Sequence, residues 1–228
     1  MHRNRARLLL LASAPRHCST SSSNLDVCPK QFPCGRNVVV TQHEQESEQR
    51  ELLQQIVDRA VLLQSRISNC TDRSIRIVCV TKGHGVNVKA AAFAAGFSDL
   101  GENYAQELVA GAASLGAGAA SLGAGAASLG AGAAGSLTSP RWHFIGGLQT
   151  NKVRSLAAIV SLWQSVDRFS LAQEIAKRAP GAQVLVQLDI AGISGRSGVA
   201  PADASELVRK CIDLGLDVRG LMGVGVPG

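Results

Sequence analysis

Hydrophobic and polar positions follow two different periods along residues 47–228. Over 47–69 the apolar residues recur at steps of three and four, which predicts an amphipathic helix. After it, short apolar runs alternate with segments of helical period, and glycine, proline or polar residues separate them. The predicted strands are 76–81, 97–100, 141–146, 162–166, 184–190 and 218–224. The predicted helices between them are 88–95, 104–110, 152–159, 170–178 and 204–214.

This order predicts an α/β fold with a parallel sheet, because repeated strand–helix units bury the strands on both faces. Counting from residue 76 gives six strands, whereas a TIM-type (β/α) barrel has eight. Two architectures remain open on the pattern alone. One is a six-stranded open sheet, and the other is a barrel that lacks its last two strands.

A low-complexity insert interrupts the pattern at 111–137. Gly-Ala-Ala-Ser-Leu-Gly-Ala occurs three times in succession and a degraded copy follows. One leucine per seven residues cannot form a coiled-coil seam, and each glycine costs about 1 kcal/mol in a helix. We therefore expect a surface loop inserted into one domain that spans 47–228.

The first 46 residues differ in composition from the rest. Residues 1–36 contain six basic residues and one acidic residue, Asp26, so they carry +5 of the net charge of +6. This Arg-rich, Ser-rich composition predicts a disordered tail and is typical of a transit peptide, for a mitochondrion or another organelle. Cytoplasm is the alternative location.

The nearly neutral remainder predicts no nucleic-acid surface. The apolar run 8–11 is too short to span a membrane. The six cysteines form no C-x-x-C pair, so we expect reduced thiols and no metal site.

Lys82 is the first candidate for chemistry. It follows the apolar run Ile77-Val78-Cys79-Val80-Thr81 and precedes Gly83, which ends the strand. The carboxyl ends of parallel strands are where α/β folds place their functional groups. A buried lysine amine can lose its proton and form a Schiff base with a carbonyl compound. The alternative is a strand-end lysine that points into water.

Several segments together resemble the pyridoxal-phosphate homeostasis protein family. The long ones are Val78-Cys79-Val80-Thr81-Lys82, Gly101-Glu102-Asn103-Tyr104-Ala105-Gln106-Glu107-Leu108 and Trp142-His143-Phe144-Ile145-Gly146-Gly147-Leu148-Gln149-Thr150-Asn151-Lys152. The short ones are Ser165-Val166-Asp167, Gly195-Arg196-Ser197-Gly198 and Gly220-Leu221-Met222. They occur in the family's order, and the resemblance covers about residues 50–228 apart from the repeat.

The resemblance implies a TIM-type barrel similar to the N-terminal domain of alanine racemase. It implies that Lys82 holds pyridoxal 5′-phosphate as an internal aldimine, and that the protein carries the cofactor, possible recipients being PLP-dependent apoenzymes, without catalysis of its own. It also implies that Asn103, His143, Ser165 and Met222 line the mouth of the cofactor pocket. Each has an alternative role: a helix cap, a core histidine, a turn hydroxyl and a core side chain, respectively.

The sequence also departs from the family. Gly147 stands where the family has histidine, and Leu100 where it has phenylalanine. The chain ends after the sixth predicted strand, so we expect the loops of strands seven and eight, which bind phosphate in such barrels, to be missing and phosphate binding to be weakened. Two further functions therefore stay open. One is an amino-acid racemase, for which Tyr104 is the single tyrosine, and the other is a remnant that no longer binds the cofactor.

Overall fold

The computed structural model describes residues 11–13, 42–118, 139–192 and 197–225. The basic tail therefore lies mostly outside the described residues, as does residue 119 onward of the predicted insert. None of the helices in the described ranges is both long and apolar enough to cross a membrane.

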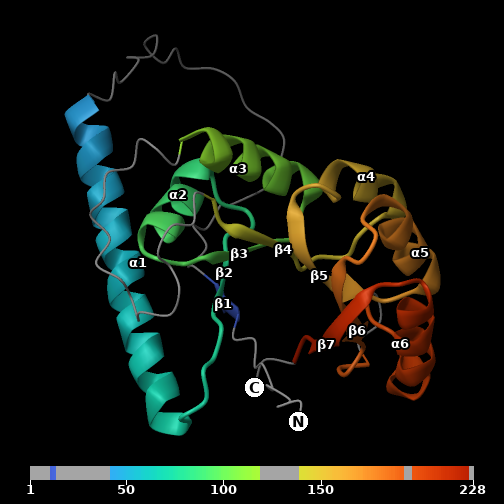
Figure 1. Cartoon of the computed structure of the whole chain (residues 1–228). Helices are drawn as coiled ribbons and strands as arrows, with labels where there is room; N and C mark the ends of the chain where they lie inside the picture. Colours follow the sequence, from blue (N-terminus) through green and yellow to red (C-terminus); the bar gives the residue numbers. More distant parts are fainter. Residues whose placement is uncertain (1–10, 14–41, 119–138, 193–196, 226–228) are drawn as a thin grey trace, which may run out of the picture.

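A parallel sheet forms the centre of the molecule (Figure 1). Its strands follow one another in sequence order from β1 to β7, and every neighbouring pair is parallel. They are β1 (Leu11–Ser13), β2 (Val78–Val80), β3 (Asp99–Glu102), β4 (Arg141–Phe144), β5 (Val160–Val166), β6 (Gln183–Leu188) and β7 (Asp217–Gly223). The strands β1 and β7 are the two edges and do not pair with each other, so the sheet is a barrel wall that stays open.

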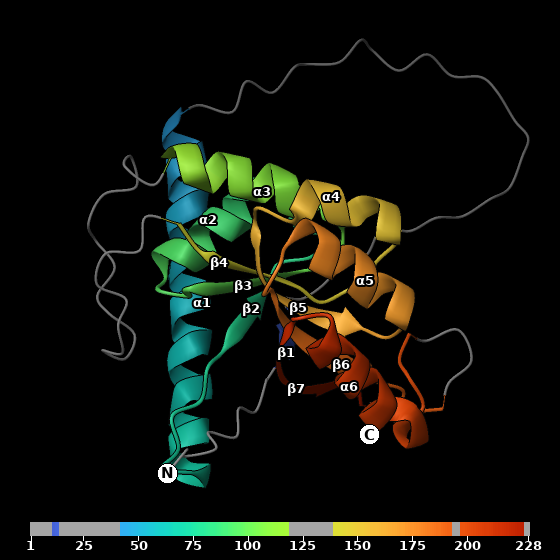
Figure 2. The same ribbon diagram turned by 45° about the vertical axis from the view of Figure 1, so that its right-hand side comes forward.

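Helices cover the outer face of this curved sheet, as both ribbon views show (Figures 1 and 2). Each helix from α2 to α5 packs on the next one along the chain, which is the arrangement that right-handed βα units give. They are α1 (Gln42–Cys70), α2 (Val86–Ala94), α3 (Ala105–Gly118), α4 (Val153–Leu156), α5 (Phe169–Arg178) and α6 (Ala204–Asp213). Two short 3-10 turns, η1 (Thr150–Lys152) and η2 (Pro201–Asp203), precede α4 and α6. The long helix α1 lies at the side and packs on α2.

Alternation along the strands separates two apolar layers. In β6, Val184 and Val186 join the large core between sheet and helices, where Trp163 is also buried. Leu185, between them, points to the opposite face and forms a small cluster with Leu162 and Met222. The inner face of the barrel wall therefore carries its own small apolar cluster, which is distinct from the large core between the sheet and the helices.

The predicted α/β fold is confirmed, and its six strands correspond to β2–β7. Of the two architectures, the structure shows a barrel-like wall that does not close. The structure differs from the prediction in two places on the amino-terminal side. Leu11–Ser13 form β1, which pairs with β2 although the tail gave no strand signal, and α1 begins at Gln42, ahead of the expected 47.

The predicted loop 111–137 is wrong at its start, because α3 continues through the first copy of the repeat to Gly118. The reason is tertiary packing. Leu108, Ala112 and Leu115 share one side of the helix, and Leu108 and Leu115 are buried in the core. This burial outweighs the poor helix propensity of the glycines.

Candidate functional site

A cavity of about 280 Å³ opens where the carboxyl ends of the strands meet. Three of the predicted site residues line it: Lys82 after β2, Asn103 after β3 and Met222 in β7. The remaining lining residues come from the ends of β4, β6 and β7 and from the loop after β6: Ile145, Gly146, Gly147, Gln187, Leu188, Asp189, Ser197 and Val224. The parallel topology thus brings residues from the ends of five strands to one place.

Lys82 stands two residues beyond β2, and its side chain is exposed at the cavity. The backbone turns immediately after it, since Gly83 has a φ of +73° and the amide of His84 donates to the carbonyl of Thr81 at 3.2 Å. A left-handed φ favours glycine. The turn therefore ends the strand and leaves the lysine at the rim of the sheet.

One wall of the cavity requires a residue without a side chain. A Cβ added at Gly146 would lie 2.4 Å from the carbonyl oxygen of Asn103 and 2.7 Å from its Cα. These atoms are backbone, so they cannot move aside easily. Gly146 thereby lets the loop after β4 approach the loop after β3, and it brings Asn103 to the cavity wall.

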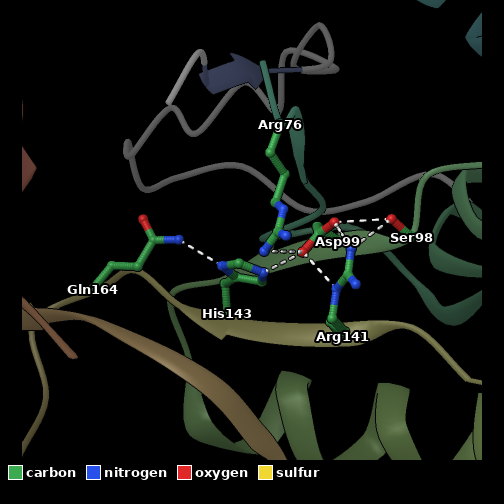
Figure 3. A network of polar contacts seen from close by, with 6 residues as sticks. All are labelled: Arg76, Ser98, Asp99, Arg141, His143 and Gln164. Carbon is green, nitrogen blue, oxygen red and sulfur yellow. Dashed lines mark hydrogen bonds and ion pairs between the residues drawn. The ribbon is translucent and has the colours of Figure 1, made fainter. Parts of the chain in front are cut away.

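His143 lies elsewhere, although it was predicted to line the pocket mouth. The side chain is buried in the polar network of Figure 3, and it is absent from the cavity lining. Its Nε2 lies 2.8 Å from Asp99 Oδ1, and its Nδ1 lies 2.7 Å from the Gln164 amide nitrogen. The structure thus places His143 as a satisfied core histidine, the alternative role, because its strand register directs it toward β3 and β5.

Ser165 is likewise absent from the lining. It is buried in β5, only 2 % exposed, and the strand is irregular between Trp163 and Val166. A register shift of this kind changes which side chains reach a given face. The sequence pattern gave no sign of the irregularity, so the position of Ser165 relative to the cavity was not foreseeable.

Asp99 is the centre of the network around His143 (Figure 3). Arg141 holds its carboxylate with two nitrogens, Nε at 3.0 Å and Nη2 at 2.6 Å, and Arg76 lies within 3.9 Å. Burial alone would raise the pKa of the Asp99 carboxyl, but the hydrogen bonds from His143 and Arg141 outweigh it and hold the pKa well below its usual range. The network is therefore an ionised structural cluster inside the wall.

The lining suits a small polar aromatic aldehyde. Its volume is close to the lower end of the range of about 300–1,000 Å³ that small-molecule pockets occupy. Lys82 provides an amine, Asn103 and Gln187 provide amides, and Met222 provides an apolar contact. Among the lining residues that the structure describes, Lys82 is the one cation. The residues therefore fit the aldehyde and ring of pyridoxal phosphate, with the amides of Gly146 and Gly147 as candidate donors to an anionic group.

Sequence reasoning missed several lining residues. Gly146 and Ser197 lie inside motifs that carried the family resemblance, yet neither has a reactive group that singles it out. Asp189 was hidden because the predicted strand ran to residue 190, whereas β6 ends at Leu188. A polar residue directly after a buried strand was the available signal.

The fold and the cavity agree with a sequence comparison. The sequence model of a family described as "Alanine racemase, N-terminal domain" matches residues 53–225. The chain belongs to this family. Curated relatives that are similar to the chain include two proteins that are each named "Pyridoxal phosphate homeostasis protein". The one from Pseudomonas aeruginosa is 31% identical over 159 residues, which cover 68% of this chain and 60% of the relative. The one from Haemophilus influenzae is 28% identical over 181 residues, which cover 77% of this chain and 67% of the relative. The chain thus spans about three fifths of the length of the Pseudomonas relative.

Solved structures show the same architecture. A protein of unknown function from Bifidobacterium adolescentis has a TM-score of 0.62 and 29% identity, over 84% of this chain and 75% of the other. PipY from Synechococcus elongatus, solved with PLP bound, has a TM-score of 0.58 and 26% identity, over 76% of this chain and 72% of PipY. PipY, which was solved with PLP bound, therefore shares the fold that forms the cavity here.

Proposed function

We propose that this protein binds pyridoxal 5′-phosphate, holds it on Lys82, and serves in the homeostasis of the cofactor without catalysing a reaction of its own. The observation that carries the proposal is the position of Lys82 at the cavity formed by the carboxyl ends of the strands. The names of the curated relatives and the PLP-bound structure of PipY support it.

The chemistry needs one nucleophilic amine. Lys82 would hold the cofactor through its amine, a nucleophile that can condense with an aldehyde to form a C=N bond with loss of water. Asn103 and the amide oxygen of Gln187, whose Nε2 donates to the Ser197 carbonyl at 2.7 Å, would provide polar contacts to the cofactor, and Met222 would provide an apolar one. Because Lys82 is the one cation in the described lining, we expect the phosphate to rely on neutral hydrogen-bond donors, for which the amides of Gly146 and Gly147 are candidates.

A racemase needs a second acid–base group on the opposite face of the substrate. Two residues of the chain are the candidates for that group. Tyr104 is 60 % exposed and is not part of the described cavity lining. Asp189 lines the cavity, but its Oδ1 accepts a hydrogen bond from the amide of Gly192 at 2.9 Å, so it is engaged in a turn. These positions favour a carrier over a racemase.

The test is to mix the purified chain with pyridoxal phosphate, reduce the product with borohydride, and map the modified peptide by mass spectrometry. We expect the adduct on Lys82 and its loss in Lys82→Ala, while Lys177→Ala, which changes an exposed lysine of α5, retains it. Equal labelling of surface lysines in both variants would refute the proposal. Racemisation of L-alanine by the loaded protein would replace the carrier with the racemase.

Two parts of the proposal concern the protein in the cell. PLP-dependent apoenzymes are the expected recipients of the cofactor. The test is whether the loaded chain reactivates such an apoenzyme faster than Lys82→Ala does with the same amount of cofactor.

The basic tail is proposed to direct the protein to an organelle. A fusion of residues 1–46 to a fluorescent protein that stays in the cytoplasm would argue against this location.

A further inference from the structure

The backbone around Lys82 is held by an ion pair that does not touch the cavity. Lys89 in α2 and Glu102 in β3 lie 3.0 Å apart, Nζ to Oε1, and their side chains are 2 % and 0 % exposed. Neither residue lines the described cavity. The pair faces the helix layer, on the other side of the wall from the amine that would hold the cofactor.

Both members of the pair bind the segment 81–84. The Lys89 ammonium donates to the carbonyl of His84 at 2.7 Å and reaches the carbonyl of Thr81 at 3.4 Å. Glu102 Oε1 accepts from the Thr81 hydroxyl at 2.5 Å. One buried pair therefore grips the residue before Lys82 and the turn after it.

Two further contacts hold the same segment, and we call the contacts of Lys89, Glu102 and Glu107 with residues 81–84 the clamp. The amide of Thr81 donates to the carbonyl of Gly101 at 3.0 Å, and the amide of Gly83 donates to Glu107 Oε2 at 2.8 Å. Glu107 lies in the first turn of α3, five residues after Glu102. The segment is thus fixed by β3, by α2 and by α3 together.

We propose that Lys89 and Glu102 are positioning residues that fix the Lys82 amine in the cavity, with Glu107 holding the turn. This inference rests on the proposed function of Lys82. The physical reason is that condensation needs the amine within bonding reach of the aldehyde carbon, and a misplacement of about 1 Å can cost about a hundredfold. Stability alone explains the pair poorly, because buried ion pairs can often be replaced by apolar residues without loss.

The Lys89 side chain has space to reach Glu102 because Gly111, next to it, has no side chain. A Cβ added at Gly111 would lie 2.9 Å from Lys89 Cδ and 2.8 Å from the Trp142 ring. Gly111 is the first residue of the repeated segment, and its lack of a side chain lets the aliphatic stem of Lys89 pass between α3 and β4. The helical start of the repeat therefore contributes to the clamp.

The experiment compares two ligands. Pyridoxal phosphate can condense with Lys82, whereas pyridoxamine phosphate fills the same cavity but has no aldehyde. The main variant is Lys89→Met/Glu102→Gln, which removes both charges together and leaves no unpaired buried charge. The matched control is Lys210→Met/Glu206→Gln, which removes an ion pair of 2.6 Å on the exposed face of α6.

We expect the main variant to bind pyridoxal phosphate about tenfold or more weakly, a change of about 1.4 kcal/mol, and to show slower borohydride-trapped labelling of Lys82. Its affinity for pyridoxamine phosphate should stay unchanged, as should both affinities of the control. Glu107→Ala, which removes the contact to the turn without altering the core pair, should give a smaller selective loss and serves if the double variant does not fold.

Three outcomes decide the matter. An equal loss for both ligands would mean that the pair only supports the fold, and it would overturn the inference. Unchanged binding of pyridoxal phosphate in the main variant would overturn the inference too. If the main variant does not fold, unchanged binding in Glu107→Ala would overturn it. Failure of the unaltered chain to label Lys82 at all would instead refute the proposed function, on which this inference rests, before any variant is compared.

Discussion

His143 Nε2 lies 2.8 Å from Asp99 Oδ1, and both side chains are only 2 % exposed. With the Gln164 amide donating to Nδ1, the proton of the imidazole is on Nε2 and the ring donates it to the carboxylate. The pair links the first residue of β3 to the middle of β4 within the barrel wall. A histidine that resembled a ligand-binding residue in the sequence is therefore a structural link between strands.

The first prediction concerns acid stability. Asp99 has a lowered pKa in the folded protein, so its contribution to stability is present above the unfolded-state pKa of about 3.9 and is lost as the pH falls below that value. Asp99→Asn should lower the free energy of unfolding at pH 7 by about 3 kcal/mol and flatten its decline between pH 5 and pH 3. Urea denaturation at several pH values measures both effects. Asp213→Asn, an exposed position of α6, is the control, and an unchanged pH slope in Asp99→Asn would contradict the assignment.

The second prediction concerns the glycine at the cavity wall. Gly146→Ala places a Cβ against the backbone of Asn103, so we expect a loss of about 1–3 kcal/mol in the free energy of unfolding, together with weaker binding of pyridoxal phosphate. Gly116→Ala, in α3, meets no atom within 4 Å and should stabilise the helix by up to about 1 kcal/mol. Thermal melts and ligand titration of the two variants check this. Equal stability of both variants would mean that the loop after β4 moves freely.

The third prediction concerns thiol reactivity. Burial raises the pKa of the Cys211 thiol to about 11, and burial with the nearby charge of Glu102 raises that of Cys79 to about 11. At pH 8 each of these two thiols is then ionised in about one molecule in a thousand, and the thiolate is the reactive form. Iodoacetamide should modify the exposed Cys70 in the native protein and spare Cys79 and Cys211, and peptide mapping by mass spectrometry shows which of these residues react.

Denaturation provides the control for this experiment. In urea Cys70, Cys79 and Cys211 should react at similar rates, because the burial that raises the pKa of Cys79 and Cys211 is gone. Modification of Cys211 as fast as Cys70 in the native protein would show that the space between β6 and α6 opens to solvent.

The fourth prediction concerns the attachment of α1. Ala60 is 5 % exposed on this helix, which packs on α2, whereas Leu62 is 62 % exposed. Ala60→Glu should cost about 1–3 kcal/mol by overpacking and make α1 sensitive to limited proteolysis. Leu62→Glu should leave both stability and cleavage nearly unchanged. The same cleavage pattern in both variants would show that α1 is not held by this contact.

The sequence by itself determined the α/β class, the six strands β2–β7 and the position of Lys82 at a strand end. These follow from local information, because apolar runs and helical periods depend on neighbouring residues. The long motifs also carried the family resemblance. Asn103 and Met222, which were predicted at the pocket mouth, line the described cavity because residues at the carboxyl ends of parallel strands converge, and their contact with a cofactor stays a prediction.

Tertiary structure decided the rest. The pairing of β3 with β4 sets Gly101 opposite His143 and brings the His143 side chain within hydrogen-bond distance of Asp99. Ser165, in the irregular stretch of β5, is absent from the cavity lining. Burial of Leu115 extended α3 into a repeat whose glycines disfavour a helix. The clamp of Lys89, Glu102 and Glu107 on the Lys82 segment joins three separate elements. Such contacts depend on residues that are distant in the chain and meet only when strands and helices pack, which no local pattern encodes.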